Sequence, residues 1–240
     1  MAAFAKLHGR RLERRWPFLP KSDEENLNLG FEDVLEFQYA RSRNFFFVGV
    51  GAFDGLENDP ISRFIRSHDC RGILIEPQPA VFQRLMSNYA CLPNVQLLNA
   101  AIDAVSGSRE FYSVPAGIEG LPSWTEQLAS FRKEHLIRHE DRAPGLSAHI
   151  RMQMVDTICF PDLLDKFGIG SIDVLQIDAE GMDAQLLAWF PFERIKPSIL
   201  HYEIAHMSAD ELTAVRSRLK TYGYTIRETN SSMDDFAVLV

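Results

Sequence analysis

Three carboxylates fall within six residues of the stretch LQIDAEGMD, residues 175–183. Asp178 ends an apolar run typical of a buried strand, Glu180 follows two residues later, and Asp183 falls in the first turn of the next expected helix. Crowded like charges cost free energy unless a cation or hydrogen-bond donors meet them. We therefore expect a cationic ligand here, with Asp178 and Glu180 as candidate bases, whereas helix N-terminal electrostatics account for Asp183.

A histidine approaches the same region from the next expected strand. The run LHYE, residues 200–203, ends that strand and carries His201 and Glu203. A histidine at this edge could remove the proton of an acceptor hydroxyl, which makes His201 a further candidate catalytic base. A buried core histidine is the alternative interpretation, and the sequence leaves both open.

The stretch FFFVGVGAFDG, residues 45–55, begins as an apolar strand and runs into a loop with few side chains. Its glycines are Gly49, Gly51 and Gly55. Because glycine lacks Cβ, such a loop lets a ligand approach the main chain. The spacing is GxGxxxG, not the GxGxxG of dinucleotide dehydrogenases, so the glycines alone are a weak indication of a nucleotide site.

The second expected strand ends in LIEP, which places Glu76 at its carboxyl end. In nucleotide-binding α/β folds, an acidic residue roughly 20 positions beyond the glycine loop accepts hydrogen bonds from ribose hydroxyls. The alternative for Glu76 is a solvent-facing side chain before a proline turn. With the glycine loop upstream, the ribose role is favoured.

The candidate site residues are positioned by an alternation of expected strands and helices. Apolar strands alternate with helical patterns, and the last two expected strands, residues 224–229 and 235–240, are close enough to form a hairpin. The pattern predicts an α/β fold with a doubly wound, mostly parallel sheet, helices on both faces and an antiparallel C-terminal strand. Ligands of such sheets bind beyond the carboxyl ends of the strands.

Composition narrows the function classes. With a formal net charge of −8, the chain lacks the overall positive charge that is typical of a nucleic-acid-binding protein. No apolar run approaches the roughly 20 residues that a membrane span needs, and the basic N-terminus has no apolar segment typical of a secretory signal. The three separated cysteines are expected to be buried thiols. We expect a cytoplasmic protein.

The motifs GVGAFDGLENDP, GILIEPQP, NAAI, LASF, LQIDAEGMD and LHYE occur in this order from about Phe45 to the C-terminus. In this order they resemble the FkbM-type S-adenosylmethionine-dependent methyltransferases. The resemblance implies a class I methyltransferase fold with seven strands, the last antiparallel. Two positions depart from the family pattern: Gly49 stands where a polar or acidic residue is usual, and Phe53 stands where Asn is usual.

The resemblance also assigns contacts to the methyl donor, S-adenosylmethionine. Glu76 would bind the ribose, and Asp103 would lie near the adenine after the third strand. Asp178 would also contact the donor. The glycine-loop residues would lie along its methionine part, and we count as contacts Gly49, Gly51, Ala52, Asp54 and Gly55.

The segment 117–150 fits the strand–helix rhythm least, and we expect it to be an insertion that covers the site and selects the acceptor. It carries His135 and His139 one helical turn apart, a spacing that can bind a metal. No third ligand is identifiable from sequence, so a solvated helix face is favoured and no metal ligand is predicted. We divide the chain into a helical extension, 1–44, and a methyltransferase domain, 45–240.

The sequence therefore predicts methyl transfer to the hydroxyl oxygen of a small-molecule or saccharide acceptor. The chain lacks the NPPY-like motif common among enzymes that methylate planar nitrogens, which favours oxygen. Two alternatives stay open: a non-catalytic binding module of the same fold, and an NAD(P)-dependent oxidoreductase. Neither the acceptor nor the oligomeric state follows from the sequence.

Overall fold

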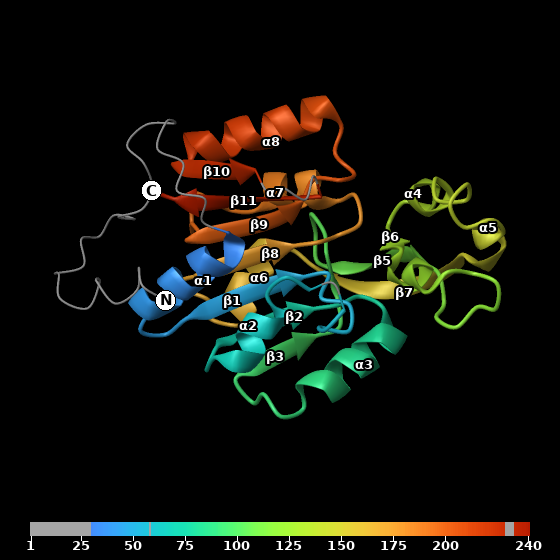
Figure 1. The fold of residues 1–240 in the computed structure, drawn as a ribbon, viewed down its shortest axis with the longest axis horizontal. Helices are drawn as coiled ribbons and strands as arrows, with labels where there is room; N and C mark the ends of the chain where they lie inside the picture. The colour runs from blue at the N-terminus through green and yellow to red at the C-terminus, as the bar shows by residue number, and fades with distance from the viewer. Residues whose placement is uncertain (1–29, 58, 229–232) are drawn as a thin grey trace.

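The computed structural model describes residues 30–57, 59–228 and 233–240, and a seven-stranded sheet forms its centre (Figure 1). The strand order is β10-β11-β9-β8-β1-β2-β3. Only β11 runs antiparallel to its neighbours, which confirms the predicted mostly parallel sheet and the C-terminal hairpin. The bounds are β1 Phe46–Val50, β2 Arg71–Ile75, β3 Val95–Leu98, β8 Val174–Ile177, β9 Ile199–Glu203, β10 Tyr224–Glu228 and β11 Asp234–Leu239.

Helices cover both faces of this sheet, as predicted. Successive side chains of a strand point to opposite faces, so Phe47 packs with the first three helices and Val48 packs with the last three. The first group is α1 Phe31–Arg41, α2 Ser62–Ser67 and α3 Pro79–Tyr89; the second is α6 Phe160–Lys166, α7 Asp183–Trp189 and α8 Ala209–Thr221. Each fully buried Leu, Ile or Phe in these layers contributes about 2 kcal/mol.

Local signals fix where the helices begin and end. Ser208 and Glu211 form the predicted capping box at the start of α8: Glu211 N donates to Ser208 Oγ at 3.2 Å, and Ser208 N donates to Glu211 Oε2 at 2.9 Å. The residue spacing in 80–90 predicts a helix face of Phe82, Leu85, Met86 and Tyr89, and Met86 does not follow it. Met86 of α3 is 44% exposed, because the buried stripe of this helix follows Val81, Leu85 and Tyr89.

A second, smaller sheet lies beyond the carboxyl ends of the central strands (Figure 1). Its order is β4-β7-β5-β6, with short helices beside it. The bounds are β4 Ala101–Ile102, β5 Gly107–Ser113, β6 Ala129–Ser130, β7 Arg151–Ile158, the 3₁₀ helix η2 Ser123–Gln127, α4 Lys133–Ile137 and α5 Leu146–His149.

The third expected strand, residues 94–102, divides between the two sheets. β3 ends at Leu98, and the Asn99 side-chain amide donates to the backbone carbonyls of Glu76 (2.8 Å) and Pro77 (3.1 Å). Asn99 therefore ties the chain to the loop after β2, and the two residues of β4 pair with β7 instead.

Two segments that the sequence set apart contribute to the fold in different ways. Of the expected extension 1–44, residues 1–29 lie outside the described residues, while α1 packs its Val34 and Leu35 into the core on one face of the sheet. The segment 117–150 and the neighbouring Val114 form a separate small core, whose other residues are Leu128, Leu136, Ala143, Leu146 and Ile150.

Cys70 is buried, whereas Cys91 is exposed, so the expectation of three buried thiols is wrong. Cys91 lies two positions beyond the end of α3, where the chain turns toward β3. Among the described ranges of the chain, no helix has the length and apolar character needed to cross a membrane.

Candidate active site

A cavity lies at the carboxyl edge of the sheet, between β1, β2 and β8 on one side and the second sheet on the other. From β1 the strand order runs to β2 and β3 in one direction and to β8 and β9 in the other, so this is the topological switch point where such folds bind ligands. The space inside the cavity, counted together with its open mouth, is about 840 Å³. Of the predicted residues, it is lined by Gly51, Ala52, Glu76, Asp178 and Glu180.

Gly51 and Ala52 form one wall of the cavity at the end of β1. Their backbone N–H groups both donate to Ile75 O at 3.0 Å, which joins this loop to the end of β2. Gly51 has a φ of +76°, and a Cβ at this position would lie 1.7 Å from the carbonyl oxygen of Asp178. Glycine is therefore required here by the approach of the neighbouring loop, before any ligand is considered.

The remaining predicted residues of the glycine loop do not line the cavity. Gly49 lies inside β1, where an added Cβ would meet the Leu74 side chain at 2.7 Å. Asp54 accepts hydrogen bonds from the N–H groups of Leu56 and Glu57, both at 2.9 Å, and so closes a turn. The Gly55 carbonyl accepts from two side-chain hydroxyls, and its glycine gives room to α3.

Phe53 occupies the position where the family usually carries Asn. Its φ is +49°, a left-handed conformation that Asn tolerates better than an aromatic residue. The ring lines the cavity, and the Arg84 guanidinium carbon lies 4.9 Å from its centroid. Phe53 thus presents an apolar surface to the cavity from a backbone conformation that Asn adopts readily.

Glu76 is the most constrained carboxylate of the site. It is 3% exposed, and each of its oxygens accepts one backbone hydrogen bond: Oε2 from Phe53 N at 3.0 Å and Oε1 from Gln78 N at 2.7 Å. Burial raises its pKa to about 8, against the lowering effect of those hydrogen bonds. Each oxygen keeps a further lone pair for a ligand hydroxyl.

Further carboxylates gather at the ends of β8 and β9. Burial and then the charges of Asp183 and Glu180 raise the pKa of Asp178 well above its ordinary value. Burial raises the pKa of Asp183 to about 7; this residue starts α7 and accepts from Ala179 N at 3.3 Å, as expected for a helix N-terminal role. Burial also pushes the pKa of Glu180 upward, but neighbouring histidines outweigh it and lower the pKa.

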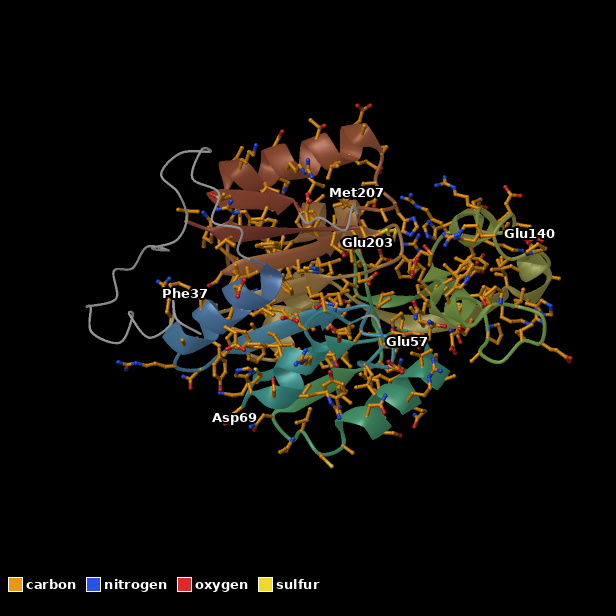
Figure 2. The ribbon with its side chains drawn as sticks, viewed as in Figure 1. Phe37, Glu57, Asp69, Glu140, Glu203 and Met207 are labelled. Carbon is orange, nitrogen blue, oxygen red and sulfur yellow. The ribbon has the colours of Figure 1, made fainter. Side chains whose placement is uncertain are left out.

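His201 does not reach the cavity, so its role as a candidate base is not supported. It lies inside β9 and is buried beneath α1, with its ring centroid 4.4 Å from that of Phe31. Burial lowers its pKa to about 4, so it is a neutral core histidine, the alternative that the sequence left open. Glu203, two residues on, does lie at the end of the strand, and Figure 2 shows it with Glu57 at the end of the sheet that faces the second sheet.

Asp103 also lies outside the cavity lining. Its carboxylate pairs with Arg109 at 2.8 Å, and the Arg109 guanidinium in turn stacks 4.4 Å from the centroid of Phe131. Phe131 and Phe111 meet edge to face with centroids 5.1 Å apart, and both rings line the cavity. The second sheet thus supplies an apolar wall, completed by Ala100, Ala101, Ile102 and Ala129.

The sequence missed several residues that line the cavity. Asp59, predicted to cap a helix, does accept from Ile61 N at 3.0 Å, but it also faces the cavity beside Gln176. Gln176 is a lone polar residue in the buried strand β8, a signal that could have identified it. Phe111 lies in β5, and no local signal shows that this strand reaches the cavity, because the sheet that it forms was not predicted.

The fold and the position of the cavity define the chain as a class I methyltransferase-type α/β protein. The family model described as Methyltransferase FkbM domain matches residues 49–226, which is more than half of the chain. The chain therefore belongs to the FkbM methyltransferase family, as the resemblance in the sequence predicted. No match was found among curated proteins.

Several solved structures align with the chain. A methyltransferase FkbM from Methylobacillus flagellatus KT aligns with a TM-score of 0.48 and 16% identity over 81% of this chain and 43% of that chain, so this chain spans less than half of that structure. A precorrin-6y C5,15-methyltransferase from Geobacter metallireducens GS-15 gives 0.43 and 13% over 86% and 87%. The N-terminal domain of human METTL16 in complex with SAH gives 0.43 and 9% over 85% and 65%.

Proposed function

We propose that the chain is an S-adenosylmethionine-dependent methyltransferase that methylates a hydroxyl oxygen of a small molecule or saccharide. The observation that carries the proposal is Glu76. Its buried carboxylate is held by two backbone N–H groups at the switch point of the sheet and lines the cavity. A carboxylate in this position accepts hydrogen bonds from the two hydroxyls of a ribose.

The rest of the cavity fits the other parts of the donor. Aromatic and small apolar residues of the second sheet, among them Phe111 and Ala101, would hold the adenine ring. Asp178 and Glu180 at the opposite end would attract the positive charges of the sulfonium and the amino group. The backbone of Gly51 and Ala52 lies between these two ends of the cavity.

When bound, S-adenosylmethionine supplies an electrophilic methyl group: its C–S bond breaks as the acceptor oxygen forms the C–O bond and loses its proton. The contribution of the chain is to hold the acceptor in line at near-attack distance and to take that proton. Asp178 is the favoured base, because burial and neighbouring carboxylates raise its pKa and so make its carboxylate more basic. Glu180 is the second candidate, since it also faces the cavity.

The acceptor would enter beside the segment 117–150. This segment contributes Gln127, Ala129 and Phe131 to the lining, which supports a role in covering the site and selecting the acceptor. The net charge of −8 argues against a polyanionic acceptor such as a nucleic acid. A neutral small molecule or saccharide is compatible with both features.

Calorimetry with S-adenosylhomocysteine tests the proposal. We expect wild-type protein to bind one equivalent, and Glu76→Ala to bind at least about tenfold more weakly because two charge-assisted hydrogen bonds are lost. Glu193→Gln changes an exposed carboxylate outside the cavity lining and serves as the control. Stronger binding of NADH than of S-adenosylhomocysteine would favour the oxidoreductase, and no donor binding at millimolar concentration would favour a non-catalytic module.

A further inference from the structure

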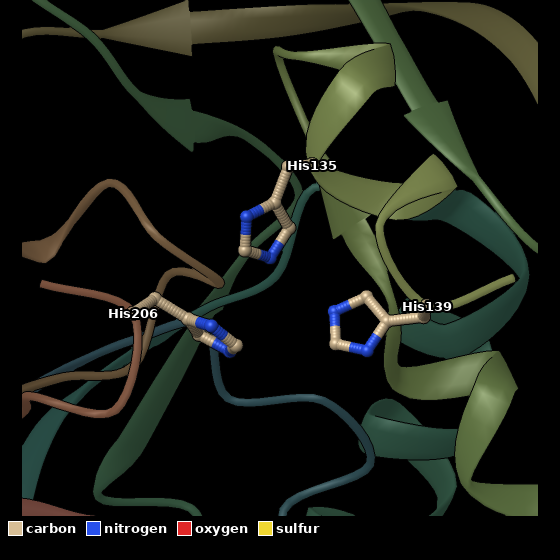
Figure 3. Close-up of side chains that lie close together, drawn as sticks. All are labelled: His135, His139 and His206. Carbon is tan, nitrogen blue, oxygen red and sulfur yellow. The ribbon is translucent and has the colours of Figure 1, made fainter. Parts of the chain in front are cut away.

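Three histidines from distant parts of the sequence meet beside the cavity (Figure 3). His135 belongs to α4, His139 lies two residues beyond the end of α4, and His206 follows β9. One side-chain nitrogen of each lies within 4.8 Å of those of the other two. The ring centroids of His135 and His206 are 4.6 Å apart, and His139 lies 5.6 and 5.8 Å from them.

The two histidines from the segment 117–150 are buried and His206 is partly buried, so the solvated helix face expected for His135 and His139 is wrong. His135 is 7% exposed and His139 is 8% exposed. The His135 ring packs against Gly181, where an added Cβ would lie 2.8 Å from two of its ring atoms. The His135 ring is therefore packed between the segment 117–150 and the loop after β8 and does not lie on a solvated face.

The polar atoms of the cluster are poorly satisfied by protein groups. His135 Nε2 is buried and makes no hydrogen bond within the described part of the chain. Its neighbour, Glu180 Oε2, lies 3.7 Å away, beyond hydrogen-bond distance, and 3.5 Å from His206 Nε2. Glu203 Oε1 lies 3.6 Å from the same His206 nitrogen. Leaving such buried groups unpaired costs about 1–3 kcal/mol each.

We propose that His135, His139 and His206 bind one divalent transition-metal ion. Imidazole nitrogen is a preferred ligand of Zn²⁺ and of other late first-row divalent ions, and three imidazoles with an open position form a common reactive zinc site. Metal–nitrogen bonds of about 2.0–2.1 Å place tetrahedral ligand atoms about 3.3 Å apart. The three rings therefore need to close by on the order of 1 Å, which side-chain rotation provides.

The carboxylates complete this arrangement. Glu180 Oε2 lies near two of the three rings, so it can occupy the fourth position or accept a hydrogen bond from a ligand ring. Glu180 also lines the cavity, which places the ion at the boundary between the cavity and the segment 117–150. In a role that rests on the proposed function, the ion would bind the acceptor hydroxyl and lower its pKa. The metal site itself does not depend on that function.

Titration of the metal-free full chain with Co²⁺ alone tests the proposal. We expect one equivalent per chain, with the intense visible d–d absorption of a low-symmetry site, displaced by one equivalent of Zn²⁺. His139→Ala and His206→Ala should each weaken binding at least about 100-fold, since each removes a direct ligand. His149→Ala changes a histidine of the same segment outside the cluster and should bind as wild type does.

A second readout covers variants that fold poorly. Zn²⁺ should raise the thermal unfolding temperature of wild type and His149→Ala but not that of His139→Gln, which keeps a polar side chain of similar size. No Co²⁺ binding by wild type, or equal binding by wild type and the cluster variants, overturns the proposal. S-adenosylhomocysteine binding is measured on the same samples. A wild-type protein that binds Co²⁺ but not S-adenosylhomocysteine would contradict the proposed function and leave the metal site standing.

Discussion

Glu76 is buried, so its charged form costs free energy. We therefore predict that this ligand-binding residue makes the ligand-free protein less stable at a pH where it is ionised. The folded-state pKa of Glu76 is about 8, raised from 4.5 chiefly by burial. A carboxyl whose pKa is raised on folding carries no penalty below the unfolded value. The penalty grows as the pH rises from 4.5 to about 8 and is constant above that window. A shift of about 3.5 pKa units corresponds to about 5 kcal/mol, of which about 4 kcal/mol is present at pH 8.

Glu76→Gln removes the charge and keeps the shape of the side chain. Near pH 4.5 the variant should be less stable than the wild type by about 1–3 kcal/mol, because the amide –NH₂ of Gln replaces an oxygen that accepts a backbone N–H and leaves that donor unpaired. From pH 4.5 to pH 8 the stability of the variant relative to the wild type should rise by about 4 kcal/mol, or about 8–16 °C in unfolding temperature for a chain of this size. Its affinity for S-adenosylhomocysteine should fall at the same time.

Urea unfolding at half-unit steps from pH 4.5 to 9 measures this difference. Glu193→Gln, an exposed carboxylate, should track the wild type across the whole range. Other buried carboxylates, such as Asp178, are present in every sample, so their titration cancels in the comparison. A stability difference between variant and wild type that does not change between pH 4.5 and pH 8 would refute the reasoning.

Three further changes test other parts of the structure. Gly51→Ala should destabilise the fold by about 3 kcal/mol or more, against about 1–2 kcal/mol for Gly117→Ala, since both have positive φ but only Gly51 meets a backbone carbonyl; urea midpoints measure both. His201→Phe should leave S-adenosylhomocysteine affinity within about twofold by calorimetry, because His201 does not line the cavity and packs against Phe31 of α1; a large loss would restore it to the site. Asp235→Asn should cost about 3 kcal/mol of unfolding free energy, because Asp235 is 0% exposed and pairs with Arg216 at 2.8 Å; an unchanged urea midpoint would contradict this.

Periodicity made the central sheet and its helices predictable. Parallel strands covered on both faces are apolar throughout, and the helices between them carry caps such as Ser208 with Glu211. The second sheet was missed for a physical reason. β4 and β6 have two residues each, and β7 exposes Met152 and Met154, so neither length nor alternation marks them as buried strands.

The site residues that directly follow a buried apolar strand were predictable from the sequence. Glu76 and Asp178 follow apolar runs, and both line the cavity. His201 misled the prediction because it lies two residues inside β9 and is covered by α1, whose position no local pattern reveals. The histidine cluster could not be found for a similar reason: His206 lies far along the chain from His139, and only the fold brings them together.

The central claim is that Glu76 and the cavity beside it bind the adenosyl part of a methyl donor. A crystal structure of the chain grown with S-adenosylhomocysteine tests it most directly. The account predicts both ribose hydroxyls within hydrogen-bond distance of the Glu76 carboxylate, with the adenine against the wall that contains Phe111. A ligand bound elsewhere, or a ribose that makes no contact with Glu76, would contradict it.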